Sequence, residues 1–213
     1  MTFSIMLSQM AIGMGRSIGI FFLTLIFSMP LGLLVSFGRM SKIKPVKYFT
    51  KFYISVLRGT PLMLQLMVVY FFPYYLFGWS IGNWRYPAII VGFVINYSAY
   101  FAEIYRSGIE AMPKGQYEAA EMLGYNKVQT FVKIILPQVI KMILPSVTNE
   151  IITLVKDTSL AFSLSYLEMF SIAKQIAAKQ TTLMDDDTLL VNEELLKGLD
   201  EELDSFLKEL LEK

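Results

Sequence analysis

The feature that most limits the fold is a segment of 22 uncharged, mostly apolar residues from Ser17 to Gly38. At a rise of about 1.5 Å per residue, a helix of this length crosses a hydrocarbon core of about 30 Å. Pro30 and Gly32 lie inside the segment, and membrane helices tolerate such residues where neighbouring helices cover the freed backbone groups. The segment therefore predicts a first transmembrane helix over residues 17–38.

Three further apolar segments predict spans over about residues 53–72, 86–105 and 138–155. The apolar fraction of 54% and the mean hydropathy of +0.50 agree with a membrane protein, since soluble chains have about 45–50% apolar residues. Gly59 and Pro61 predict local unwinding in the second span. We expect an all-α, polytopic membrane helix bundle with about four recognisable spans.

Five cations follow the first span within 13 residues: Arg39, Lys42, Lys44, Lys47 and Lys51. Positive charge beside a membrane helix marks the cytoplasmic side, so the N-terminus is expected outside. Aromatic residues then fill residues 73–85, which is typical of an external loop at the membrane interface. We interpret Trp79 and Trp84 as interfacial anchors, with contact to a docked protein as the alternative.

Catalytic chemistry has little support in the sequence. Cysteine and histidine are absent, which removes the commonest general base and most zinc ligands. No G-x-x-x-x-G-K-S/T phosphate loop is present, so ATP binding of that kind is not expected in this chain. We predict a protein that is not an enzyme and binds neither a metal nor a cofactor itself.

Among the polar residues within the predicted spans, we single out Asn96, Glu103, Asn149 and Glu150. Ionisable groups are costly in a membrane and mark a polar pathway by default. We assign all four to a candidate substrate pathway. For Glu103, pairing with Arg106 or Arg58 is an equal alternative, and for Asn149 and Glu150 structural pairing is the alternative.

A charged segment lies between the third and fourth spans, within about residues 108–136. Glu118 to Leu123 are strong helix formers, and Gly124 stands where a helix end favours positive φ. Asn126 and Gln129 have the spacing of a capping box, and Pro137 fits the start of the next helix. The pattern predicts a helix, a turn and a second helix, and by itself an ordinary amphipathic loop is equally consistent with it.

The spacing of this segment resembles a known motif. Glu118-Ala119-Ala120, Gly124 and then Ile134, Leu136 and Pro137 are similar to the EAA loop of permease subunits of ABC importers. Four other stretches resemble the polar amino acid uptake subfamily over about residues 10–184: Leu57-Arg58-Gly59-Thr60-Pro61-Leu62, Ala102-Glu103-Ile104, Pro113-Lys114-Gly115-Gln116 and Lys156-Asp157-Thr158-Ser159-Leu160.

The resemblance implies a type I ABC importer permease fold in a bacterial cytoplasmic (inner) membrane. It implies that Glu118, Ala119, Ala120 and Gly124 couple the chain to a cytosolic ABC ATPase subunit, which uses ATP and Mg. The other implied partners are a second permease copy, in a homodimer or a heterodimer, and an extracytoplasmic amino-acid-binding protein; no nucleic acid is expected. The implied function is ATP-driven import of polar amino acids, and a carboxylate at mid-membrane depth would suit a cationic one.

The end of the chain departs from this family. Residues 1–184, the predicted transmembrane permease domain, carry 16 Lys and Arg against 7 Asp and Glu, whereas residues 185–213 carry 3 against 11. Asp157 and Thr158 are expected to cap a packing helix over 159–179. Beyond it, the leucine spacing predicts an acidic amphipathic helix whose regularity resembles an engineered or foreign segment.

No fifth span is recognisable in residues 185–213. The alternative function is therefore a non-transporting membrane interaction or scaffold protein, or a redesigned permease fragment. A secondary transporter has no support, since no inverted repeat is evident.

Overall fold

The computed structural model describes residues 3–80 and 83–179 of the 213-residue chain. In these residues the fold is all-helical, without a β-strand, as predicted. Three helical stretches within these residues are long and apolar enough to cross a membrane. A bent pair of helices, over residues 44–59 and 62–77, gives a fourth span if the pair is counted as one. The predicted acidic helix over 185–213 lies outside the described residues.

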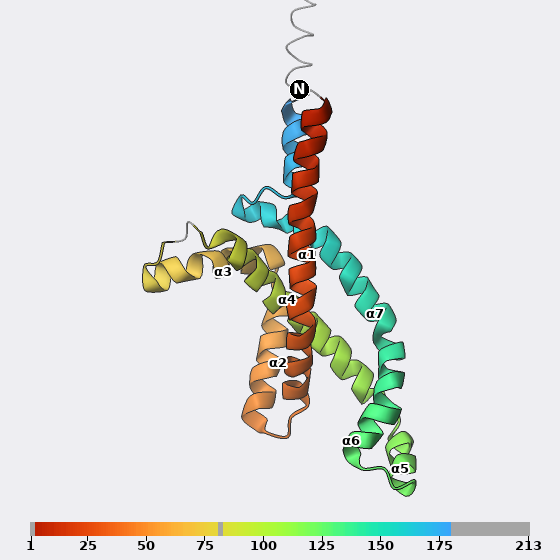
Figure 1. Cartoon of the computed structure of the whole chain (residues 1–213). Coiled ribbons are helices and arrows are strands. Elements are labelled where there is room, and N and C mark those ends of the chain that lie inside the picture. The colour runs from red at the N-terminus through yellow and green to blue at the C-terminus, as the bar shows by residue number, and fades with distance from the viewer. Residues whose placement is uncertain (1–2, 81–82, 180–213) are drawn as a thin grey trace, which may run out of the picture.

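Helix α1 (Phe3–Met40) is the longest straight element in Figure 1, and it begins well before the predicted Ser17. Its buried positions recur mostly every fourth residue: Gly13, Ile20, Thr24, Ser28, Gly32 and Ser36. Most of them are small, so the backbone of α4 (Arg85–Glu110) approaches closely. A Cβ atom added at Gly32 would lie 2.8 Å from the Cβ atom of Phe101.

The predicted second span over 53–72 differs from the structure, where two helices replace one. α2 (Lys44–Gly59) and α3 (Leu62–Phe77) meet at an angle of 114°. Thr60 and Pro61 between them have extended backbones. The unwinding expected at Gly59 and Pro61 is therefore a full break, and α3 leaves the bundle sideways (Figure 1).

The largest buried cluster gathers around α4. Phe93, Tyr97 and Phe101 of α4 pack with residues of α1, α3 and α7 (Leu136–Asp157), including Ile20, Leu66 and Leu154. Trp84 also packs against this cluster, and its Nε1 donates to the carbonyl of Val69 at 3.3 Å, whereas Trp79 is exposed. Helix α4 thus forms the centre against which the other long helices pack.

The predicted helix–turn–helix is present between α4 and α7. It consists of α5 (Lys114–Met122), a turn, α6 (Lys127–Gln129) and a π-helical segment, Thr130–Ile135, that leads into α7. Gly124 has φ +80°, and the capping box between Asn126 and Gln129 has both hydrogen bonds, at 2.9 and 3.0 Å. These two local predictions are confirmed.

The prediction of one helix over 159–179, capped by Asp157 and Thr158, is wrong. Asp157 ends α7, Thr158–Leu164 is a 3₁₀-helix, and Ser165 then turns the chain with φ 54°. A new helix covers residues 169–179. Glu168 caps it, because its carboxylate accepts from the N–H groups of Phe170 and Ser171 at 2.6 and 2.8 Å.

Candidate functional site

Three helices, α2, α4 and α7, bring ionisable side chains close to one another. The hydroxyl of Tyr97, on α4, donates to Oδ2 of Asp157, at the end of α7, over 2.7 Å. The ring of Tyr97 lies 6.1 Å from that of Tyr100, centroid to centroid. Tyr97 is buried, so the Asp157 carboxyl is anchored to the core of the bundle.

Arg58 completes this group from the last turn of α2. Its guanidinium carbon lies 5.3 Å from the centre of the Tyr100 ring, a cation–π contact. Glu150, half-buried on α7, interacts electrostatically with both Arg58 and Asp157. We call Arg58, Tyr97, Tyr100, Glu150 and Asp157 the polar cluster. It contains one guanidinium group, which is exposed, and two partly buried carboxyl groups.

The remaining predicted pathway residues make their contacts outside this cluster. Asn96 is buried, and its amide donates to the Leu57 carbonyl and to Gln65 Oε1 at the break between α2 and α3. Asn149, adjacent to Glu150 in sequence, has an exposed side chain. Of the four predicted residues, the structure therefore places only Glu150 in the polar cluster.

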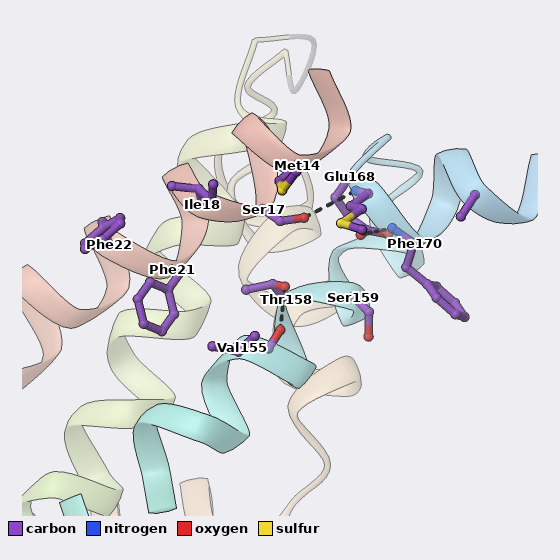
Figure 2. A pocket seen from close by; sticks show the side chains of 12 residues that line it. Met14, Ser17, Ile18, Phe21, Phe22, Val155, Thr158, Ser159, Glu168 and Phe170 are labelled. Carbon is purple, nitrogen blue, oxygen red and sulfur yellow. Dashed lines mark hydrogen bonds between the residues drawn. The ribbon is translucent and has the colours of Figure 1, made fainter. Parts of the chain in front are cut away.

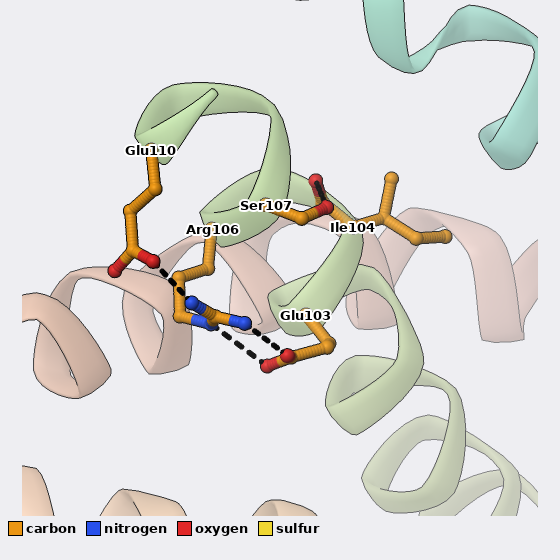
Figure 3. Close-up of polar contacts among 5 residues, drawn as sticks. All are labelled: Glu103, Ile104, Arg106, Ser107 and Glu110. Atoms are coloured by element: carbon orange, nitrogen blue, oxygen red, sulfur yellow. Dashed lines mark hydrogen bonds and ion pairs between the residues drawn. The ribbon is translucent and has the colours of Figure 1, made fainter. Parts of the chain in front are cut away.

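Glu103 pairs with Arg106, one of the two partners that the sequence analysis left open. Arg106 forms ion pairs with Glu103 and with Glu110, one helical turn on either side of it along α4 (Figure 3). All three are on one helix, so the pairs bridge neighbouring turns of α4. Glu103 is thus engaged by a local partner near the end of the helix that leads to α5.

Sequence reasoning missed four of the five members of the polar cluster. Arg58 was considered only as a pairing partner of Glu103 and as part of a resembling stretch, Asp157 was expected to cap a helix, and Tyr97 and Tyr100 were not singled out. One signal was available, because Arg58 and Asp157 each interrupt a long apolar stretch, which is where ionisable residues most often serve function. Their proximity depends on the fold and is invisible in the sequence.

The segment with the EAA pattern leads into the start of α7, whereas Asp157 of the polar cluster ends that helix (Figure 1). Glu118 and Ala119 are exposed, Ala120 is buried, and Gly124 makes the turn. Three large apolar side chains at the tip are more than two-thirds exposed: Met122, Leu123 and Val128. Such a concentration of exposed apolar groups on a polar segment is typical of a protein-binding surface.

A separate cavity of about 540 Å³ lies between α1 and the segment that follows α7 (Figure 2). Its lining is mainly apolar and includes Met14, Phe21, Phe22 and Phe170. Glu168 borders it, but its carboxylate is occupied in capping the next helix. The cavity therefore lacks the free charges that a polar amino acid requires.

No group of three or more His, Cys, Asp or Glu side chains within residues 3–80 and 83–179 is arranged to hold a metal ion. The described part of the chain thus offers polar recognition in the polar cluster and a protein-binding surface at the EAA segment.

The family described as binding-protein-dependent transport system inner membrane component matches residues 28–165. The L-cystine transport system permease protein TcyB of Bacillus subtilis (strain 168) is 36% identical over 168 residues, covering 78% of this chain and 70% of that protein. The octopine transport system permease protein OccM of Rhizobium radiobacter is 35% identical over 164 residues, covering 72% of this chain and 67% of that protein.

A crystal structure of an amino acid ABC transporter with histidines superposes with a TM-score of 0.71 at 31% sequence identity. The superposition covers 89% of this chain and 95% of that one. The family match, the named relatives and the solved structure all indicate a transporter permease. The chain therefore belongs to the binding-protein-dependent transport system inner membrane components, as an amino acid ABC transporter permease.

Proposed function

We propose that this permease carries polar amino acids inward past the polar cluster, driven by an ATPase that docks on the EAA segment. The observation that supports the proposal is the convergence of Arg58, which is exposed, with the partly buried Glu150 and Asp157 from two helices, α2 and α7. Charged side chains within membrane-spanning segments are costly, and a polar route for substrate explains why they are there. An apolar route would need none of them.

The chemistry of the cluster fits an α-amino acid. Arg58 is suited to the substrate carboxylate, because a guanidinium offers paired donors to a carboxylate. Glu150 and Asp157 are suited to the ammonium group. Two carboxyl groups face one guanidinium, so a second positive charge on the substrate is also accommodated. We therefore propose a preference for cationic amino acids.

Coupling is proposed to run through the turn around Gly124. Glu118, Ala119 and Ala120 form the helix before that turn, and the exposed apolar tip would enter a groove of the ATPase. The ATPase binds ATP and Mg, so hydrolysis takes place outside this chain. A second permease copy and an extracytoplasmic amino-acid-binding protein complete the proposed complex, in which the N-terminus of this chain lies outside the cell.

The test is uptake of radiolabelled amino acids in proteoliposomes containing this chain, its ATPase and its binding protein. We expect ATP-dependent uptake, with arginine and lysine preferred over glutamine. Glu150→Gln should lower arginine uptake about tenfold relative to glutamine uptake, as expected for one lost charged hydrogen bond. Glu110→Gln, which removes a carboxylate outside the polar cluster, is the matched control and should leave the ratio unchanged.

Two results would refute the proposal in different ways. An equal loss of arginine and glutamine uptake in Glu150→Gln would contradict the preference for cationic substrates. A chain that fails to co-purify with any ATPase would contradict coupling and favour the scaffold alternative, which has no need of an ATPase groove.

A further inference from the structure

The break between α2 and α3 leaves a backbone group without its helical partner. In a continuous helix the carbonyl of Leu57 would accept a hydrogen bond from the N–H of residue 61. Residue 61 is proline, which has no N–H to donate. An unpaired carbonyl is especially unfavourable in a membrane protein, so another donor is required at this point.

Two amide side chains supply that donor. Gln65, on α3, donates from Nε2 to the Leu57 carbonyl at 2.9 Å, and Asn96, on α4, donates from Nδ2 to the same oxygen at 3.2 Å. The two amides also bind each other, because Asn96 Nδ2 donates to Gln65 Oε1 at 2.9 Å. We call Asn96 and Gln65 the amide pair.

The amide pair joins all three helices at one point. Gln65 Nε2 also lies 3.0 Å from the carbonyl and 2.8 Å from the hydroxyl oxygen of Thr60, inside the break. Asn96 is only 3% exposed, so its amide has no access to water as an alternative partner. The angle between α2 and α3 is thus fixed by polar contacts to the break and to α4.

The hydrogen bonds to the Leu57 carbonyl also affect where Arg58 lies. Arg58 directly follows Leu57, and Tyr100, whose ring it faces, lies one turn after Asn96 on α4. The hydrogen bonds to the Leu57 carbonyl therefore hold the adjacent backbone against the part of α4 that carries Tyr100. Tyr53 adds a second tie nearby, since its hydroxyl donates to the Ile95 carbonyl at 2.8 Å.

We propose that Asn96 and Gln65 are positioning residues that fix the α2–α3 break and thereby hold Arg58 in the polar cluster. This inference rests on the proposed function, because Arg58 is taken to bind the substrate carboxylate. The amide pair itself does not touch substrate. Its loss should weaken substrate binding while the assembled transporter still turns over.

The first measurement is the KM and kcat of uptake for Gln65→Glu and Asn96→Leu in the complete reconstituted complex. Gln65→Glu keeps an oxygen for Asn96 but removes the donor to Leu57 and Thr60, and Asn96→Leu keeps similar volume without hydrogen bonds. We expect KM to rise about tenfold in both, with kcat per assembled complex changed less than about twofold. Gln9→Glu, at an exposed glutamine of α1, should leave both constants unchanged.

A purely structural role would give a different pattern. It would lower the amount of assembled complex and leave the KM of the surviving molecules unchanged. An unchanged KM in Gln65→Glu and Asn96→Leu, in a complex that transports, overturns the inference.

The second measurement does not depend on transport. The chain contains no cysteine, so single cysteines at Phe52 on α2 and Tyr75 on α3, 68% and 78% exposed, can carry a pair of spin labels. We expect one narrow distance distribution in nanodiscs and a broader, shifted one after Gln65→Glu or Asn96→Leu. Unchanged distances overturn the inference. A parent complex without uptake overturns the proposed function instead, and the label distances then decide whether the amide pair fixes the break.

Discussion

The turn at Gly124 allows the proposed coupling to be tested with a single methyl group. Gly124 has φ +80°, and a Cβ atom built there has no atom within 4 Å. The whole effect of Gly124→Ala therefore comes from the left-handed backbone, which costs an L-residue about 1–2 kcal/mol. That energy lowers the population of the native turn about 5- to 30-fold relative to alternative turn conformations.

The assay is the number of amino acids taken up per ATP hydrolysed in the reconstituted complex. We expect Gly124→Ala to lower this ratio, because a turn with another geometry transmits ATPase closure poorly. Gly124→Pro should abolish coupled uptake, since proline fixes φ near −65° and removes the N–H that donates to the Glu121 carbonyl at 2.9 Å. Gly124→Asn should retain most of the ratio, since asparagine tolerates positive φ.

Gly115→Ala is the matched control. Gly115 lies in the first turn of α5, also has open space around a built Cβ, and has no positive φ. The added methyl group should therefore have little effect there. Equal coupling ratios for Gly124→Ala and Gly115→Ala would refute the assignment of the turn as the coupling element.

Three further changes test separate contacts. Tyr97→Phe removes the 2.7 Å hydrogen bond to Asp157, worth roughly 1–3 kcal/mol, and should raise the KM of uptake. Gly32→Val places atoms against Phe101 and should destabilise the α1–α4 packing by about 1–3 kcal/mol, measured as a lower unfolding midpoint. Asn126→Ala removes the capping box, costing about 1 kcal/mol, and should lower the coupling ratio.

Each of these changes has a matched control. Tyr75→Phe removes a hydroxyl from an exposed tyrosine and should leave KM unchanged. Gly15→Val adds the same atoms to α1 where nothing lies within 4 Å, so the unfolding midpoint should stay in place. Asn126→Ser keeps a good capping residue and should retain coupling. If a control variant changes the measured quantity as much as its test variant does, the role assigned to that contact is wrong.

Local rules explain what the sequence predicted well. The first span follows from an uncharged length, and the turn at Gly124 and the capping box at Asn126 follow from residues within four positions of one another. Each feature has its physical cause in the same short segment. Such features need no knowledge of the rest of the fold.

The features that the sequence did not reveal depend on distant partners. Gly59 and Pro61 indicated unwinding, but they did not indicate the bend of 114° or the hydrogen bonds from Gln65 and Asn96 to the freed carbonyl. Asp157 followed the pattern of a helix cap, whereas its carboxyl binds Tyr97, 60 positions earlier. Contacts at such separations are set by the packing of α4 against α2 and α7, which no local pattern encodes.

The arrangement of the helices indicates how a movement of the EAA segment would reach the polar cluster. One helical stretch runs from Lys127 through α7, so it connects the segment to Glu150 and Asp157. Arg58, by contrast, lies on α2, which the amide pair ties to α4. A displacement of α7 along or about its axis therefore moves the two carboxyl groups relative to Arg58. The Tyr97–Asp157 hydrogen bond links α4 to the end of α7, so such a displacement has to break this bond or carry Tyr97 with it.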